Sequence, residues 1–130
     1  MIQFHLDNRS GVPTYLQLAQ QVRQAVRLGV LRPGDQLPTV KEVVSSLTIN
    51  PNTVLKAYRE LDREGVVEGR RGIGTFVAAL PDSPPPEGVK ELRTALNKWV
   101  QRARSAGLDE EGMAALFADT VRPPVISRVA

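Results

Sequence analysis

The side chains with the clearest chemical potential lie in the stretch INPNTVLKAYREL, at residues 49–61. Read as a helix, this stretch has an apolar face at the i, i+3, i+4 and i+7 positions, made of Val54, Ala57, Tyr58 and Leu61. The remaining face offers hydrogen-bonding, apolar and cationic groups from Asn52, Leu55, Lys56 and Arg59. No carboxylate occurs from Val43 to Arg59. We therefore expect this face to approach a polyanion, because an acid there would be repelled by phosphate charge.

The rest of the sequence offers little material for catalysis or metal binding. There is no cysteine, which excludes disulfides, thiolate metal sites and a cysteine nucleophile. The single histidine, His5, cannot form a histidine-cluster metal site by itself and is expected at the surface. No Ser/His/Asp group is suggested, and the glycines of GRRGIGTF lack the strand-then-helix context of a nucleotide-phosphate loop. The sequence thus predicts neither an enzyme nor a cofactor or metal site.

The charge is modest but unevenly distributed. The formal net charge is +3, and residues 1–78 hold the whole excess, with 10 Lys and Arg against 7 Asp and Glu. Residues 79–130 carry 7 of each kind. This favours an anionic partner for the first part, although an excess of this size is, by itself, ordinary scatter. No apolar run is long enough to span a bilayer and no secretion signal is apparent, so we expect a cytoplasmic protein without a membrane partner.

Two helices are expected before the one that carries these groups. Residues 13–28 place apolar side chains at helical spacing, and Gly29 ends that pattern. The segment LRPGDQLP then supplies turn residues. Thr39 and Glu42 form a capping-box pair, which predicts a short helix that ends near Leu47.

The third helix has its own start and stop signals. Asn50 can cap it, Pro51 suits its first position because no amide donor is needed there, and Gly65 suits a left-handed C-terminal residue. From Val66 to Val77 the pattern is that of a β-hairpin, with a loop near residues 69–72. This order of elements predicts a winged helix-turn-helix, a mostly α fold with a small β-hairpin wing.

In such modules the second helix of the pair enters the DNA major groove with its N-terminal residues leading. Asn52 is suited to adenine, and Lys56 and Arg59 to phosphate or guanine. Leu55 either touches a thymine methyl or is simply an exposed leucine, and Arg59 alternatively joins a surface cluster with neighbouring acids. The wing is expected to lie along a neighbouring groove through Arg70, Arg71 and Gly72. The competing function is a winged helix that binds protein or RNA without operator specificity.

The proline-rich stretch ALPDSPPPEG marks a boundary, because three consecutive prolines favour a stiff extended spacer. We predict a DNA-binding domain at 1–79, a linker at 80–88, and a helical hairpin at 89–130 with a second helix capped by Asp109. A hairpin of this size buries too little apolar area alone, so we expect it to pair with a second copy in a homodimer. The expected anchors are Leu92, Leu96, Trp99, Val100, Met113, Leu116 and Phe117. The alternative is that the hairpin folds back on its own winged helix.

Residues 29–77 closely resemble the winged helix-turn-helix of GntR-type transcription regulators. The similarity rests on PGDQLP, on TV at 53–54, on REG at 63–65 and on GIGTF at 72–76. The segments VPTYLQLAQQVRQAV and INPNTV, with the short tail, resemble the YtrA-type subfamily. The resemblance implies a homodimeric bacterial repressor that binds a two-fold symmetric operator in double-stranded DNA.

Carried over by position, the resemblance implies DNA contacts at a defined set of residues. They are Thr39, Lys41, Asn50, Asn52, Thr53, Lys56 and the wing segment from Arg70 to Gly74. Lys41 stands where most of the family has Arg, which keeps the charge but loses the rigid two-pronged donor. Pro51 and Leu55 stand where many relatives have Arg. A small-molecule effector between the tail helices or at the dimer seam is possible, but no residue indicates one.

Overall fold

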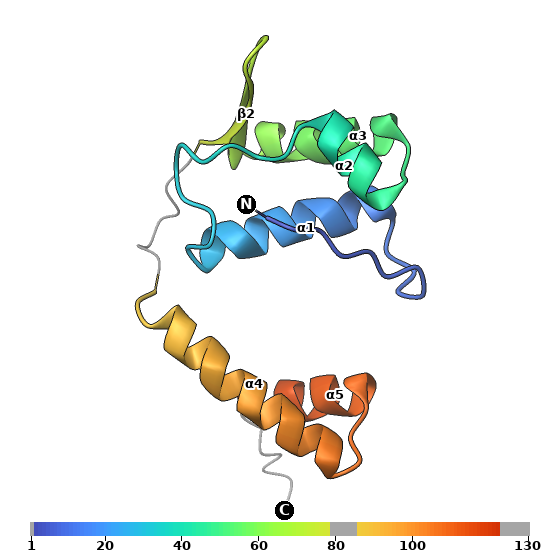
Figure 1. The fold of residues 1–130 in the computed structure, drawn as a ribbon, viewed down its shortest axis with the longest axis vertical. Helices are drawn as coiled ribbons and strands as arrows, with labels where there is room; N and C mark the ends of the chain where they lie inside the picture. Colours follow the sequence, from blue (N-terminus) through green and yellow to red (C-terminus); the bar gives the residue numbers. More distant parts are fainter. Residues whose placement is uncertain (1, 79–85, 123–130) are drawn as a thin grey trace, which may run out of the picture. The chain divides into compact units, whose positions relative to one another are not determined.

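The computed structural model describes residues 2–78 and 86–122 and divides the chain into two compact units, residues 1–87 and 88–130 (Figure 1). The first unit contains α1 (Thr14–Arg27), α2 (Val40–Leu47), α3 (Pro51–Arg63), β1 (Val67–Arg70) and β2 (Gly74–Val77). The second contains α4 (Val89–Ser105) and α5 (Glu110–Val121). The structure is therefore mostly helical with one hairpin, as predicted. Most of the predicted linker, and the end of the tail from residue 123, lie outside the described residues.

The core of the first unit forms where α1 meets the apolar face of α3. Leu18, Ala19 and Val22 of α1 are fully buried, because they share the helical face predicted from their spacing. The four residues predicted to form the apolar face of α3 are also buried: Val54, Ala57, Tyr58 and Leu61. Packing of these two faces fixes which side chains of α3 remain outside.

The helix-turn-helix begins and turns with the predicted local chemistry. The Thr39 hydroxyl accepts from the Glu42 amide and the Glu42 carboxylate accepts from the Thr39 amide, which completes the capping box of α2. Thr48 ends α2 in the left-handed region, with φ 54°, so that the chain reverses into α3. The Tyr58 hydroxyl donates to the Pro38 carbonyl at 2.6 Å, and burial raises the pKa of Tyr58. This bond fixes the segment before α2 to α3.

The wing differs from the prediction at its edge and at its turn. Strands β1 and β2 pair antiparallel, with Gly69 opposite Thr75, so Gly69 lies in a strand rather than in the loop. Residues 34–37 add a third extended segment, because the Leu37 amide donates to the Thr75 carbonyl and the Val77 amide to the Asp35 carbonyl, both at 2.8 Å. The sequence of PGDQLP predicted only a turn, so this pairing was not expected. The pairing attaches the wing to the segment that leads into α2.

The N-terminal residues form an extended segment that the sequence reading did not anticipate. Ile2, Phe4 and Leu6 alternate toward the core and pack against it, while His5 is exposed as expected. Gln21 of α1 holds this segment: its Oε1 accepts from the His5 amide at 2.9 Å, and its Nε2 donates to the His5 carbonyl. This segment thus becomes part of the surface beside α2.

The second unit is a helical hairpin with little interior of its own. Asp109 caps α5 as predicted, with its Oδ1 accepting from the Gly112 amide at 2.7 Å. Among the described residues of this unit only Ala103 and Met113 are buried. Leu116, Phe117 and Val121 of α5 are 43%, 54% and 61% exposed in the single chain. Their apolar surface is left uncovered by this hairpin.

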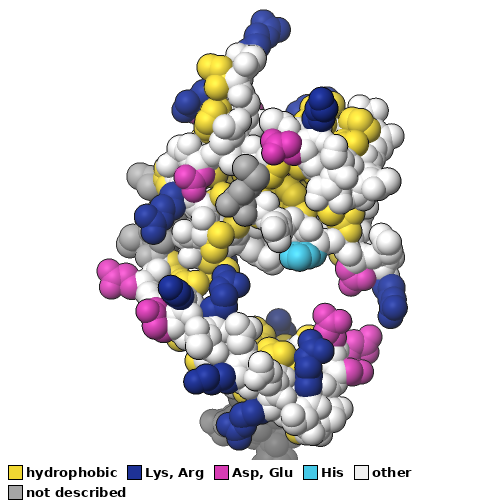
Figure 2. All heavy atoms as spheres, viewed as in Figure 1, with side chains coloured by type: hydrophobic (Ala, Val, Ile, Leu, Met, Phe, Trp, Pro, Cys, Tyr) yellow, Lys and Arg dark blue, Asp and Glu magenta, His cyan; other side chains and the backbone are white. Residues whose placement is uncertain are grey.

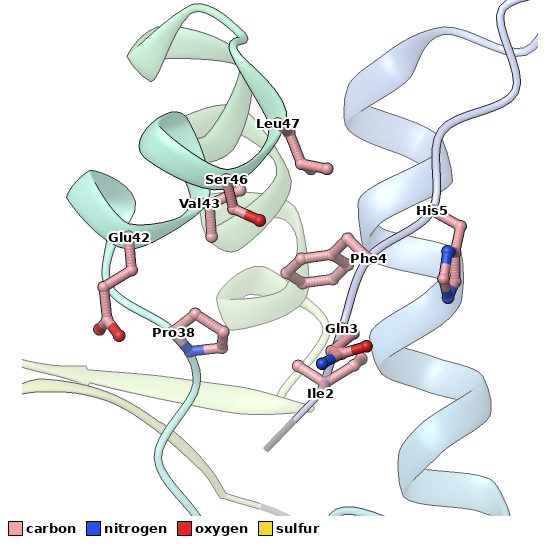
Figure 3. A pocket seen from close by; sticks show the side chains of 9 residues that line it. All are labelled: Ile2, Gln3, Phe4, His5, Pro38, Glu42, Val43, Ser46 and Leu47. Atoms are coloured by element: carbon pink, nitrogen blue, oxygen red, sulfur yellow. The ribbon is translucent and has the colours of Figure 1, made fainter.

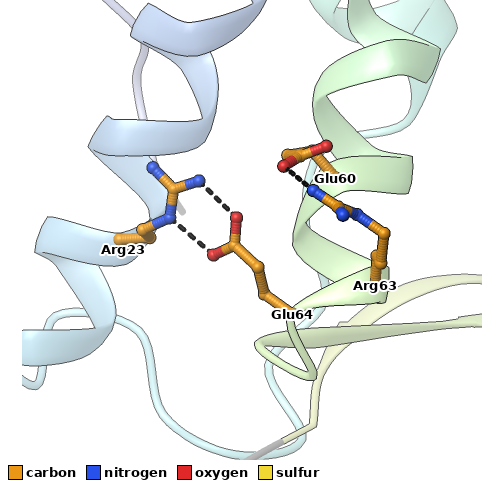
Figure 4. A network of polar contacts seen from close by, with 4 residues as sticks. All are labelled: Arg23, Glu60, Arg63 and Glu64. Carbon is orange, nitrogen blue, oxygen red and sulfur yellow. Dashed lines mark hydrogen bonds and ion pairs between the residues drawn. The ribbon is translucent and has the colours of Figure 1, made fainter.

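A two-pronged ion pair joins α1 to the end of α3 (Figure 4). Arg23 Nε and Nη2 donate to the two oxygens of Glu64 at 2.7 and 2.5 Å. The hydrogen bond from Arg23 lowers the pKa of the Glu64 carboxyl. Arg63 pairs with Glu60 on the adjacent turn (Figure 4). The acids near the end of α3 are therefore satisfied within the fold.

We predict that Glu64→Gln lowers the free energy of unfolding at pH 7 by about 0.5–1 kcal/mol, because both partners are about one-third exposed. Since folding depresses the pKa of Glu64, its contribution is present above the ordinary value of 4.5 and is lost as pH falls below it. Urea denaturation at pH 7 and at pH 3 measures this. The mutant and parent should differ at pH 7 and converge at pH 3, with Glu87→Gln as the control, because Glu87 is exposed and forms no ion pair with the described residues. An equal difference at both pH values would contradict the assignment.

Candidate nucleic-acid interface

The leading end of α3 is capped locally and open to solvent. Asn50 Oδ1 accepts from the Asn52 amide at 2.8 Å, and the Asn50 carbonyl accepts from the Thr53 amide. Pro51 occupies the first turn, where an amide donor would have no intrahelical partner. The Asn52 side chain is exposed and makes no side-chain hydrogen bond to the described part of the chain. The side-chain amide of Asn52 is therefore available to donate a hydrogen bond to a binding partner and to accept one from it.

The side chains that follow on α3 also face outward. Leu55 is 41% exposed, and Lys56 and Arg59 are exposed. The Lys56 ammonium lies 4.1 Å from the centre of the Tyr15 ring of α1, which orients the cation without neutralising it. Arg59 forms no ion pair with any residue that the structure describes, so the expected alternative of a cluster with its neighbouring acids is not realised.

Several predicted side chains converge on one open pocket of about 360 Å³ between the starts of α1 and α3. Its lining consists of Thr14, Tyr15, Asn50, Asn52, Thr53 and Lys56. Four of these were predicted as DNA-contacting residues from the resemblance, whereas Thr14 and Tyr15 were not. The helical pattern of residues 13–28 carried no signal that the Tyr15 ring would support Lys56. The pocket is polar, and the described residues that line it include no acid.

The start of α2 brings two further predicted residues to the surface. Thr39 and Lys41 are exposed. The Thr39 hydroxyl accepts from the Glu42 amide at 3.1 Å, which leaves its proton available to a phosphate oxygen. Hydrogen bonds from the Thr39 backbone and side chain lower the pKa of Glu42, so its carboxylate is charged at neutral pH. Glu42 is the acid that lies nearest in sequence to these two residues.

The two arginines of the wing have different surroundings. Arg70 donates to Glu68 at 3.0 Å and lies over the Phe76 ring at 4.5 Å, so it is held within the wing. Arg71 and Gly72 are exposed in the turn, and the described residues provide no ion pair for Arg71. Figure 2 shows basic side chains at the tip of the projecting hairpin. Arg71 is thus the wing cation with its charge uncompensated by the fold.

Gly74 has a local structural requirement that the resemblance did not reveal. Its φ is 146°, and a Cβ at this position would stand 2.6 Å from Gln36 Nε2. Glycine is favoured there because L side chains rarely adopt this φ, whereas the flexible end of the Gln36 side chain could move away from a Cβ. Ile73, which lies within the predicted wing segment, is 66% exposed beside it.

The described residues contain no cluster of His, Cys, Asp and Glu able to hold a metal ion. None of the helices in the described residues is both long enough and apolar enough to cross a membrane.

Comparisons with known proteins agree with this geometry. The family model described as bacterial regulatory proteins, gntR family, matches residues 14–77. The HTH-type transcriptional repressor YtrA of Bacillus subtilis is 39% identical over 107 residues, covering 82% of this chain and 82% of that protein. The chain also resembles the crystal structure of a transcriptional antiterminator from Listeria monocytogenes, with TM-score 0.61, 32% identity and coverage of 93% of this chain and 91% of that one.

A third similarity concerns a structure that contains DNA. AraR(DBD) in complex with operator ORE1 matches with TM-score 0.50 and 27% identity, over 60% of this chain and 95% of that chain. The winged helix-turn-helix predicted from the order of elements is confirmed by these similarities.

We predict that Asn50→Ala lowers the free energy of unfolding by about 1 kcal/mol, because it removes the side chain that caps α3. Asn50→Asp should retain stability, since a carboxylate caps equally well, yet it places a negative charge at the leading end of α3. Urea denaturation of both variants tests this pair. Equal destabilisation by Ala and Asp would show that Asn50 does not act as a cap.

Proposed function

This chain belongs to the gntR family of bacterial regulatory proteins and is a DNA-binding transcription regulator. We propose that it is a homodimeric repressor that binds a palindromic operator in the cytoplasm. The observation that carries the proposal is the exposed leading face of α3, where Asn52, Lys56 and Arg59 lie on turns that contain no acid before Glu60. Duplex DNA carries roughly one negative charge per 1.7 Å of axis, so a face of this composition suits it.

We assign base reading to the first turns of α3 in the major groove. The Asn52 side-chain amide can pair with adenine at two points, with its Nδ2 donating to N7 and its Oδ1 accepting from N6. Leu55 is exposed enough to contact a thymine methyl. Lys56 and Arg59 reach phosphate or guanine, with Tyr15 supporting Lys56.

Phosphate contacts are assigned to elements around α3. Thr39 and Lys41 at the start of α2 supply a hydroxyl and a cation, and the Thr53 side chain lies in the polar pocket beside Lys56. At the wing, Arg71 and Gly72 are better placed than Arg70, which is engaged by Glu68 and Phe76. These contacts position the protein on the duplex but carry no base information themselves.

Repression is supported by a relative and pairing by the tail. The similar protein of Bacillus subtilis is named a transcriptional repressor. In the tail, Leu92, Leu96, Leu116 and Phe117 are 66%, 48%, 43% and 54% exposed. A second copy that presents the same surface would cover them. A two-fold symmetric dimer would present two DNA-binding units, which suits two half-sites arranged as a palindrome. Trp99 and Val100 are half-buried and can extend this surface, whereas Met113 is already buried in its own hairpin.

We predict that Asn52→Ala weakens binding to the preferred operator by about 1–3 kcal/mol and relaxes base choice, because the adenine contact is lost. Arg71→Ala should weaken all duplexes alike and reduce the salt dependence, because it removes a phosphate contact. The operator comes from selection of genomic fragments by the purified protein, followed by fluorescence anisotropy against a scrambled duplex. An equal loss on both duplexes for Asn52→Ala would remove its assignment to base reading.

A separate prediction concerns the tail. Leu96→Arg should raise the dimer dissociation constant by about tenfold or more, because a charge would enter an apolar interface. Asn97→Arg, one position further along α4, should leave the dissociation constant unchanged. Sedimentation of the full chain measures the association. A parent chain that is monomeric at all concentrations, or a Leu96→Arg dimer as stable as the parent, would contradict the pairing.

A further inference from the structure

A second pocket lies in the first unit, between the N-terminal segment and α2 (Figure 3). Its volume is about 420 Å³, which falls within the range of roughly 300–1,000 Å³ that is usual for small-molecule sites. It is distinct from the polar pocket at the start of α3, with which it shares no lining residue.

The lining combines an apolar body with a few polar groups. Apolar side chains come from both walls: Ile2, Phe4, Pro38, Val43 and Leu47. Figure 3 shows the Phe4 ring directed toward α2, with the Ser46 hydroxyl on the facing wall. Gln3, His5 and Glu42 complete the rim. This composition suits an amphipathic ligand, because a mostly apolar pocket with few polar groups orients its occupant through those groups.

The charge of the pocket comes from one carboxylate. Among the described residues that line the pocket, Glu42 is the only acid and none is Lys or Arg. Its Oε1 accepts from the Thr39 amide at 3.1 Å, while its second oxygen has no hydrogen-bond partner among the residues described. Hydrogen bonds from Thr39 lower the pKa of Glu42, so this carboxylate stays negative at neutral pH. A cationic group is therefore attracted to this end of the pocket, and an anion is repelled.

We propose that this pocket binds a small molecule with an apolar body and one cationic amine, and that the bound molecule changes the affinity of the protein for DNA. The first half stands on the pocket alone. The second half rests on the proposed function, because it requires α2 and α3 to contact an operator.

The pocket is coupled to the proposed DNA surface through two hydrogen bonds. Glu42 is one partner of the capping box, so an ammonium bound to its carboxylate acts directly on the group that caps the start of α2. Pro38, another lining residue, accepts from the Tyr58 hydroxyl of α3 at 2.6 Å. A ligand that binds the free and DNA-bound forms unequally at these points must shift DNA affinity by that same ratio.

Three matched probes test the proposed chemistry: 2-phenylethylamine, 2-phenylethanol and 3-phenylpropanoate. They share an aromatic body and differ in carrying a positive, neutral or negative group. Amide chemical shifts of the isotope-labelled full chain, followed by NMR during titration, report both affinity and location. The amine should bind most tightly, with the largest shifts at residues 2–6 and 40–47. The absence of binding, shifts confined to the tail, or preference for the anion would overturn the proposal.

Two variants test separately how the Glu42 charge and the pocket volume contribute to ligand binding. Glu42→Gln keeps a capping-box side chain and should weaken the amine about three- to fivefold, the effect of an exposed ion pair, without changing 2-phenylethanol. Ser46→Phe should fill the pocket and abolish binding of both. Glu68→Gln on the wing is the control for loss of an exposed carboxylate. Unchanged amine affinity in Glu42→Gln, with the fold intact by circular dichroism, would overturn the assigned ligand class.

Anisotropy with the selected operator then tests the regulatory half. Saturating 2-phenylethylamine should shift the dissociation constant of the parent for DNA, and the shift should disappear in Ser46→Phe. Binding in the pocket with no shift in DNA affinity would overturn regulation but leave the ligand site. Failure of the parent to select any operator would instead contradict the proposed function, while the NMR titration still decides the pocket.

Discussion

The burial of one face of α3 against α1 is the constraint on which the rest of the structure depends. Val54, Ala57 and Leu61 are completely covered, and burial of each large aliphatic side chain is worth roughly 1.5–3 kcal/mol. Rotation of α3 about its axis would expose this face, so the helix has one stable orientation. That orientation points Asn52 and Arg59 to solvent. The chemistry of the outer face is therefore set by packing on the inner one.

Charge is segregated along the length of α3 in a way that this orientation exploits. Its leading turns contain no acid, whereas Glu60, Asp62 and Glu64 gather at the trailing end. There each acid has a partner within the fold: Glu60 pairs with Arg63, Glu64 with Arg23, and Asp62 accepts from the Gly69 amide at 3.2 Å. The same acids that stabilise the contacts of α3 with α1 and the wing are thus kept away from the end proposed to meet DNA.

Local signals in the sequence were sufficient to predict the helices of the first unit. The capping pair Thr39 and Glu42, the cap Asn50 and the spacing of the apolar residues act over a few positions, and each was confirmed. Features that depend on distant segments were missed. Residues 34–37 pair with β2, and Gln21 holds the N-terminal segment, because of hydrogen bonds between parts of the chain that no local pattern relates.

The candidate site shows the same division between local and distant information. The exposure of Asn52 and Lys56 follows from helical periodicity, but the support of Lys56 by Tyr15 and the engagement of Arg70 by Glu68 and Phe76 do not. In the tail, periodicity identified apolar positions without distinguishing Met113, covered within the hairpin, from Phe117, left open.

Amide hydrogen exchange of the full chain, with and without the selected operator duplex, tests the central claim most directly. The account predicts that DNA slows exchange at residues 50–56 of α3 and 70–74 of the wing, and that a scrambled duplex has a smaller effect at residues 50–56. Protection concentrated on α4, with residues 50–56 unchanged, would contradict it.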